Sequence, residues 1–350
     1  MPHDTISLPD LGWSNHFLRQ IKLDELERST PARVTGVHRT VVDALTQVGP
    51  VRVAMTPTLA EGQPAVGDWL LVDNTGHARL LDRKSVLARR AAGSNPIPQP
   101  IVANIDTCLI TTSCDDDFNL ARLERYLALT LQAGVTPVVL LTKADLAEDP
   151  DSFKSDAQHL RSGLVVETVN ALETESVAKQ LSPWTGKGQT IVLVGSSGVG
   201  KTTIANALTG RNEATQDVRS DDAKGRHTTT ARTMFRLLAG GWLIDTPGMR
   251  ELRLMDAAEG IDSVFDDIAK LAETCRFSDC SHETEPGCAI RSAIEAGTLE
   301  EERLIRWNKL QREDRFNSQT VAEARAHSRK TGRMISTGKK TGLNKRKFID

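Results

Sequence analysis

Long apolar runs and a basic leader are both missing from this 350-residue sequence. No apolar stretch approaches the ~18 to 20 residues that a membrane-spanning helix needs, so we expect no contact with a membrane. The first residues, MPHDTISLPDLGW, contain two acids and neither a basic nor an apolar segment, which argues against a secretory signal. We therefore expect a cytoplasmic protein.

Cysteine is also scarce, and the composition is otherwise that of a globular protein. Hydrophobic residues make up 39% of the sequence and charged residues 26%, which excludes a disordered chain, a collagen and a coiled-coil rod. At about 100 to 200 residues per domain, the length predicts two or three domains, and we expect a monomer. Three of the five cysteines lie between Cys275 and Cys288, which favours metal binding in a reducing compartment over disulfides.

The net charge of -2 hides an uneven distribution. Residues 329–350 carry eight basic residues and one acid, a charge of +7, so residues 1–328 carry -9. This basic tail is suited to contact with a polyanion such as nucleic acid. A solvated chain end is an equally good interpretation of the tail alone.

The first third of the chain predicts a small β domain. Residues 1–31 form an N-terminal extension, and residues 32–93 hold five short β-type runs separated by Gly, Pro and Asn turns. These runs predict an OB-type β-barrel, with an SH3-like barrel as the alternative. Its basic residues could face RNA or simply be solvated; they are Arg39, Arg79, Arg83, Lys84, Arg89 and Arg90. Alternating Pro96, Pro98 and Pro100 then mark a linker.

A different pattern begins after the linker. Residues 101–255 alternate apolar strands such as IDTCLITT with amphipathic helices such as NLARLERYLALTLQAG, which predicts an α/β domain with a parallel sheet. Helical patterns dominate residues 256–328, on both sides of a Cys/His cluster.

A phosphate-binding loop follows the strand TIVLV and precedes a helix. It fits G-x-x-x-x-G-K-[ST] and comprises Gly195, Ser196, Ser197, Gly198, Val199, Gly200, Lys201, Thr202 and Thr203. Backbone N–H groups of such a loop, together with the helix N-terminus, bind phosphate oxygens. We expect Lys201 to reach the β- and γ-phosphates and to act in catalysis, and Thr202 to bind Mg²⁺.

Two further segments could complete the phosphate site. The strand GGWLI ends in Asp245-Thr246-Pro247-Gly248, where we expect Asp245 to contact Mg²⁺, commonly through water, and Gly248 to donate its N–H to the γ-phosphate. Between this strand and the phosphate loop, G-R-H-T-T-T offers a threonine that could close on Mg²⁺. Spacing does not separate Thr228, Thr229 and Thr230, and we select Thr229; an edge strand is the alternative.

A motif earlier in the chain could bind the base of a nucleotide. The strand VTPVVLL ends in Thr142-Lys143-Ala144-Asp145, which resembles the guanine motif N-K-x-D of GTPases. Asp145 would read the base and the Lys143 stem would cover its face. Thr142 stands where asparagine usually ties this loop to the phosphate loop, which leaves the strength of guanine selection open. A charged cap after a strand is the alternative.

The cysteine cluster has metal-ligand spacing. Cys275, Cys280, His282 and Cys288 form C-x4-C-x-H-x5-C. Three thiolates and one imidazole complete a tetrahedral Zn²⁺ shell with no position left for water. We therefore predict one structural zinc ion.

The order of the motifs carries a family resemblance. T-K-A-D, G-S-S-G-V-G-K-T, G-R-H-T-T-T and D-T-P-G follow one another in the order of a circularly permuted GTPase. Over roughly residues 32–315, the sequence resembles the RsgA or YjeQ family, which matures the small ribosomal subunit. Departures from the family pattern are Thr142 for asparagine, Ser196 for the frequent glutamine and Asn170 for serine.

The resemblance implies a fold and a function. The fold is α/β, a circularly permuted P-loop GTPase domain with an N-terminal OB-type barrel and a C-terminal helical zinc-binding domain. The function is late maturation of the 30S subunit, which stimulates GTP hydrolysis, and GDP release accompanies departure. The barrel and the zinc domain would contact 16S rRNA.

The residue after D-x-x-G is Met249, whose thioether cannot orient water as the glutamine of many GTPases does. His227 is the nearest group with a suitable pKa range, and the family assigns this role to the matching histidine. Two alternatives remain: a nucleic-acid-binding regulator that hardly hydrolyses its nucleotide, and an ATPase acting on RNA.

Overall fold

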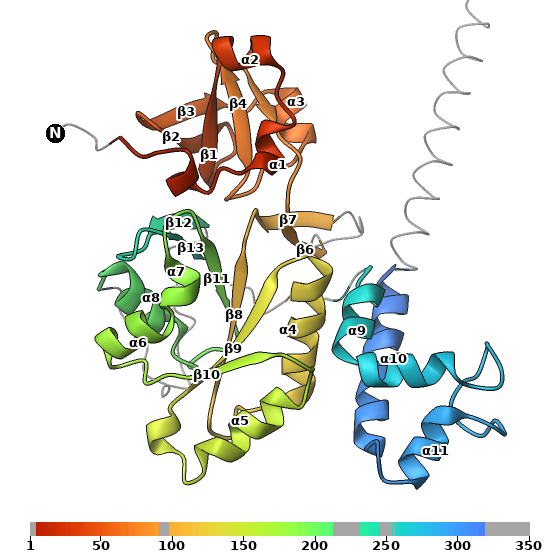
Figure 1. Ribbon diagram of the computed structural model, residues 1–350. Coiled ribbons are helices and arrows are strands. Elements are labelled where there is room, and N and C mark those ends of the chain that lie inside the picture. Colours follow the sequence, from red (N-terminus) through yellow and green to blue (C-terminus); the bar gives the residue numbers. More distant parts are fainter. Residues whose placement is uncertain (1–4, 91–97, 213–231, 246–253, 255, 319–350) are drawn as a thin grey trace, which may run out of the picture.

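The computed structural model describes residues 5–90, 98–212, 232–245, 254 and 256–318 (Figure 1). His227, Thr229 and Gly248, and the basic tail 329–350, lie outside the described residues. The expectations attached to them stay predictions.

The N-terminal part of the chain folds into a five-stranded antiparallel sheet of order β3-β2-β1-β4-β5. Its strands are β1 (Ser29–Val37), β2 (Val41–Thr46), β3 (Gly49–Ala54), β4 (Trp69–Asp73) and β5 (Ala78–Leu80). Short helices precede and interrupt it: η1 (Pro9–Leu11), α1 (Asn15–Leu18), α2 (Leu23–Arg28) and α3 (Pro57–Glu61). The sheet has the five strands that the sequence predicts, but residues 32–93 also contain a sixth strand, β6 (Val86–Arg90), which lies outside this sheet. The OB-type barrel classification stays a prediction.

A two-stranded ribbon connects this sheet to the next. β6 (Val86–Arg90) pairs antiparallel with β7 (Pro98–Ala103). Pro98 and Pro100, which we assigned to a linker, therefore lie in a strand. Both strands of a ribbon are edge strands, where a proline without an N–H can be accommodated.

The central sheet has six strands in the order β10-β9-β8-β11-β13-β12. They are β8 (Thr107–Ser113), β9 (Thr136–Thr142), β10 (Val165–Thr168), β11 (Thr190–Val194), β12 (Thr233–Arg236) and β13 (Trp242–Asp245). Only β12 among them runs antiparallel, which confirms the predicted parallel α/β domain.

Helices cover both faces of this sheet (Figure 1). They are α4 (Leu120–Gln132), α5 (Pro150–Gln158), α6 (Thr174–Gln180), α7 (Ser182–Thr185) and α8 (Lys201–Thr209). Side chains alternate along β8: Ile110 belongs to the buried cluster of Leu127 on α4, whereas Leu109 belongs to that of Ile204 on α8. This period of two explains why the buried strands read as continuous apolar runs.

The C-terminal part is helical, as predicted. It contains α9 (Ala258–Val264), α10 (Asp266–Glu273) and α11 (Ala289–Glu295), and residues 301–318 form a further helical segment. α9 packs on α4 so closely that a Cβ on Gly260 would lie 2.1 Å from the Ala128 carbonyl oxygen. Glycine is therefore required at this crossing.

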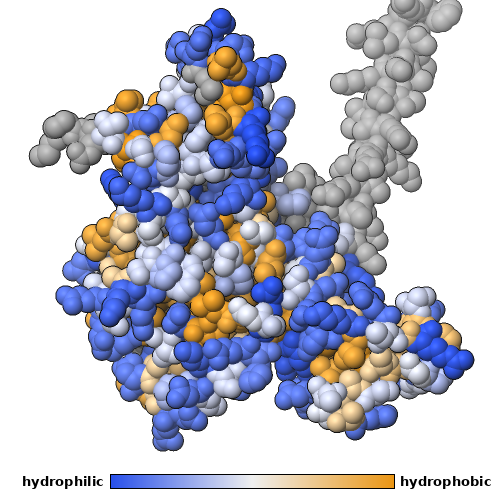
Figure 2. All heavy atoms as spheres, in the orientation of Figure 1, coloured by the Kyte–Doolittle hydropathy of each residue, from blue (hydrophilic) through white to orange (hydrophobic). Residues whose placement is uncertain are grey.

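None of the helices in the described ranges is long and apolar enough to span a bilayer. On the face drawn in Figure 2, hydrophobic residues form separate patches among hydrophilic ones.

Candidate functional site

The predicted phosphate loop connects β11 to α8. Its glycines adopt backbone angles that other residues avoid, with φ of 142° at Gly195, 79° at Gly198 and 89° at Gly200. A Cβ on Gly195 would lie 2.1 Å from the carbonyl oxygen of Thr111 on β8. The loop therefore requires glycine here for close approach as well as for turning.

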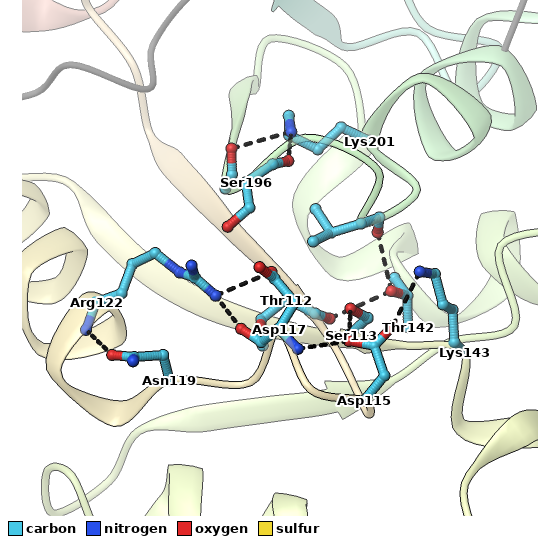
Figure 3. Close-up of polar contacts among 12 residues, drawn as sticks. Thr112, Ser113, Asp115, Asp117, Asn119, Arg122, Thr142, Lys143, Ser196 and Lys201 are labelled. Atoms are coloured by element: carbon cyan, nitrogen blue, oxygen red, sulfur yellow. Dashed lines mark hydrogen bonds and ion pairs between the residues drawn. The ribbon is translucent and has the colours of Figure 1, made fainter. Parts of the chain in front are cut away.

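Lys201 begins α8, followed by Thr202 and Thr203 in its first turn. The Lys201 ammonium donates to the carbonyl oxygens of Gly195, at 3.0 Å, and of Ser196 (Figure 3). This lysine is thus held inside the loop that it would serve. A phosphate oxygen bound there would replace neutral carbonyls with a charged acceptor, which makes a stronger hydrogen bond.

The predicted guanine loop begins at Thr142, the buried last residue of β9. Its hydroxyl lies 2.9 Å from the Val199 carbonyl oxygen in the phosphate loop and 3.2 Å from that of Thr112. The hydroxyl therefore ties the two loops together, a role that asparagine fills in N-K-x-D. The departure at this position does not remove the tie.

Lys143 follows in the left-handed region, with φ 56°, and Ala144–Leu146 form a 3-10 turn that leaves Asp145 exposed. The Lys143 ammonium lies 3.0 Å from a carboxylate oxygen of Asp115 (Figure 3). Burial raises the pKa of Asp115, but hydrogen bonds from Ser113, the Asp117 N–H and Lys143 outweigh it, so the pKa is lowered.

Two more elements end at the same edge of the sheet. After β10, Ala171 approaches the phosphate loop, because a Cβ on Gly200 would lie 3.6 Å from the Ala171 Cβ. Asn170 closes a local turn by accepting the Leu172 N–H at 3.1 Å. Asp245 ends β13, which pairs in parallel with β11, so the predicted magnesium contact lies at the carboxyl edge that carries the phosphate loop.

The four predicted zinc ligands come together between α10 and α11. Their donor atoms all lie within 4.8 Å of one another. The Cys275 and Cys288 sulfurs are 4.0 Å apart, and His282 Nδ1 lies 3.6 and 3.5 Å from them. A tetrahedral zinc with bonds of about 2.3 Å to sulfur and 2.0 to 2.1 Å to nitrogen requires separations of this size. The cluster can therefore hold one zinc ion.

Comparisons with known proteins agree with this geometry. The RsgA GTPase family model matches residues 80–255. The Small ribosomal subunit biogenesis GTPase RsgA 2 of Vibrio parahaemolyticus is 48% identical, covering 93% of this chain and 91% of the relative. The RsgA of Mesorhizobium japonicum is 47% identical, covering 93% and 95%. The chain belongs to the RsgA GTPase family.

Solved structures show the fold of this family. YjeQ from Thermotoga maritima has a TM-score of 0.59 at 22% identity and covers 81% of this chain and 97% of its own. YloQ, described as a circularly permuted GTPase, has a TM-score of 0.59 at 22% identity, with 83% and 96% covered. As an RsgA family member, this chain is a GTP hydrolase, and its predicted guanine motif precedes its predicted phosphate loop in the sequence.

Ser113 and Asp115 also lie at this candidate site, although no sequence motif named above includes them. Both lie where β8 ends, between β9 and β11 in the sheet. A parallel strand in that position delivers the residues after it to the nucleotide edge. The run Cys-Asp-Asp-Asp directly after this strand was the signal that could have identified them.

Proposed function

We propose that this chain is a GTPase that binds the small (30S) ribosomal subunit and assists its late maturation, and that the subunit stimulates its hydrolysis. The observation that carries the proposal is the hydrogen bond from Thr142 to Val199. It joins the guanine loop to the phosphate loop, so that one nucleotide can contact both Asp145 and Lys201. The names of relatives matching over 93% of the chain support the ribosomal role.

Base and phosphates would be bound by residues of two loops. Asp145 accepts the hydrogen bonds of guanine, and Lys143 covers the base. The phosphate loop, residues 195–203, donates its N–H groups to the phosphates, and Gly248 adds one more at the γ-phosphate. Lys201 leaves its carbonyl partners and turns to the β- and γ-phosphate oxygens.

Two metals fit the proposal. Thr202, Asp245 and Thr229 would hold Mg²⁺, which supplies positive charge at the β- and γ-phosphates. Cys275, Cys280, His282 and Cys288 would hold a structural zinc, because four protein donors leave no open coordination position.

His227 would orient or deprotonate the attacking water, since Met249 cannot. The N-terminal barrel and the zinc domain would contact 16S rRNA, and the protein would act as a cytoplasmic monomer. GDP would leave as the protein departs from the subunit.

GTP hydrolysis by the full chain, measured with and without purified 30S particles, tests the proposal. We expect stimulation by the particles and no competition by ATP. His227→Ala should lower the stimulated rate by about 100-fold, a typical loss for a general base. His159→Ala is the matched control, because His159 is exposed and, among the described residues, its ring hydrogen-bonds with Ser155 one helical turn away.

Stimulation that persists in His227→Ala would remove His227 from the catalytic step. Absence of stimulation, or activity that ATP competes away, would overturn the ribosome-activated GTPase.

A further inference from the structure

Asp115 occupies the position between the two nucleotide loops. It follows β8, the strand that lies between β9, which ends in the guanine loop, and β11, which leads into the phosphate loop. One carboxylate oxygen accepts the Ser113 hydroxyl at 2.6 Å and the Asp117 N–H at 2.9 Å. The other lies 3.0 Å from the Lys143 ammonium (Figure 3).

These contacts fix the carboxylate independently of Lys143. Ser113 is fully buried, with 0% of its surface exposed, so its hydroxyl is a rigid donor. The Asp117 N–H belongs to the same short loop. Two donors on one oxygen leave the second oxygen aimed at Lys143.

The direction of the ion pair indicates where the aliphatic stem of Lys143 runs. Lys143 starts at the end of β9, and its ammonium is held over the end of β8, the next strand toward β11. Its aliphatic stem therefore runs from the guanine loop toward the phosphate loop, across the space in which the base of a nucleotide joined to both loops must lie.

We propose that Asp115 is a positioning residue for guanine nucleotides, which holds the Lys143 ammonium so that the lysine stem lies across the base. The inference rests on the guanine specificity proposed above and adds a residue that selects the conformation of the base-covering lysine. Asp115 itself does not touch the nucleotide in this role.

Charge repulsion alone predicts that neutralising Asp115 has the opposite effect on nucleotide binding. GDP and GTP are anions, so neutralising a nearby carboxylate should strengthen their binding. If Asp115 positions Lys143, its neutralisation should instead weaken binding. The sign of the effect therefore separates the two interpretations.

The test uses the full chain and N-methylanthraniloyl-GDP, with dissociation constants measured by fluorescence titration. Asp115→Asn keeps an oxygen that can accept from Ser113 and Asp117, so the loop is retained and only the ion pair is lost. We expect binding about fivefold weaker, the upper range for a partly exposed pair. Asp116→Asn is the control, since Asp116 is an exposed acid of the same loop, and should leave binding unchanged or slightly tighter.

A double-mutant cycle distinguishes positioning from a general structural role. Lys143→Met keeps an apolar stem without the ammonium. In that background Asp115→Asn should change the dissociation constant by less than about 1.5-fold, because the pair that it breaks is already absent. A structural role of Asp115 would persist there.

Each outcome has one meaning. Unchanged or tighter binding by Asp115→Asn, in a protein that still prefers GDP to ADP, overturns the positioning role and leaves the proposed GTPase intact. An equal loss in the Lys143→Met background overturns it as well. A parent protein without preference for guanine overturns both proposals.

Discussion

The N-terminal sheet and the C-terminal helices lie on either side of the central sheet and its helices, and their apolar cores differ. One face of the N-terminal sheet has a buried cluster of its own, formed by Val34, Val42, Val53, Leu59 and Leu70. The C-terminal helices have no such separate cluster among the described residues, because Ile261, Phe265 and Leu304 share one with Leu127 of α4. The N-terminal sheet therefore keeps one apolar cluster of its own, although Trp69 and Leu71 on its other face share the large cluster with the central sheet. The C-terminal helices depend on the shared cluster and, in our proposal, on zinc.

The N-terminal sheet and the C-terminal helices each contact the central part of the chain, and we call these contacts the N-terminal and C-terminal joints. The side chains buried at the two joints carry opposite charges. At the N-terminal joint, Arg33 is 1% exposed, and its guanidinium donates to neutral oxygens. These are the carbonyl of Leu11, that of Asn104 at 3.1 Å and the hydroxyl of Thr190 at 2.7 Å. Burial lowers the pKa of Arg33 to about 10, so the side chain remains charged at neutral pH.

At the C-terminal joint the buried charge is a carboxylate. Glu124 of α4 is 0% exposed and accepts Arg306 Nε at 2.9 and 3.0 Å, with Arg303 at 3.6 Å. Arg303 also forms two hydrogen bonds with Asp267, at 2.7 and 2.9 Å. Arg33 is a cation among neutral acceptors, whereas Glu124 is an anion among cations. Losing one partner should therefore change the free energy of unfolding by different amounts at the two joints.

The largest expected effect is removal of zinc. Cys288→Ser or a chelator should unfold the segment around 275–295, because structural zinc contributes on the order of 10 kcal/mol to the folding of small zinc domains. Hydrogen exchange should show lost protection there and unchanged protection in β1 to β4. Equal loss in both regions would mean that the N-terminal core is not independent.

The next effect is expected at Glu124. Arg306→Met leaves this carboxylate buried with only the more distant Arg303, and should lower the free energy of unfolding by about 3 kcal/mol. Urea unfolding followed by tryptophan fluorescence measures it, because the buried Trp307 of this helical part contributes to the signal of the five tryptophans. Adding Glu124→Gln should recover part of the loss, because no unpaired charge remains.

Arg125→Met is the matched control for that change. Arg125 lies next to Glu124 on α4, and its pair with Glu313 is partly exposed, with side chains 33% and 24% accessible. Loss of this ion pair should lower the free energy of unfolding by less than about 1 kcal/mol. If both methionine variants cost the same, burial is not what makes the Glu124 joint sensitive.

Short-range patterns explain what could be predicted from the sequence. The strand, glycine loop and helix around Lys201 are contiguous, and Cys275 and Cys288 are separated by thirteen positions. Local backbone geometry is enough to bring such groups together. The alternation of buried strands and helices likewise predicted the parallel sheet.

Contacts between distant residues could not be predicted in this way. Asp115 and Lys143 are 28 positions apart, and Arg33 meets Thr190 across 157. Whether the shorter Thr142 side chain reaches Val199 depends on how β9 and β11 lie on either side of β8, which one-letter patterns do not encode. Pro98 and Pro100 were misassigned because the sequence did not show that a ribbon would provide two edge strands.

A smaller effect is expected at Arg33. Arg33→Met leaves the Leu11 and Asn104 carbonyls and the Thr190 hydroxyl without this donor, at a cost of about 2 kcal/mol. The N-terminal extension should then become more sensitive to limited proteolysis. Arg33→Lys should be intermediate, because one ammonium cannot reproduce the fork of a guanidinium. Full stability of the methionine variant would contradict this role for the buried cation.

The smallest effect concerns a partly exposed carboxylate of the N-terminal sheet, Asp43, and it tests the contribution of burial. Asp43 accepts Arg52 Nε and contacts His38 Nε2, both at 2.9 Å, and these hydrogen bonds, Arg52 first, lower its pKa below the usual 3.8. A depressed carboxyl pKa stabilises the fold fully above 3.8 and ever less as the pH falls through the folded value. Because the Asp43 side chain is 34% exposed, Asp43→Asn should cost only about 0.5 kcal/mol at pH 7. In thermal unfolding, this difference should shrink in high salt and below pH 3.8. A cost equal to that of Arg306→Met would show that desolvation does not make the buried Glu124 carboxylate more sensitive than the Asp43 carboxylate.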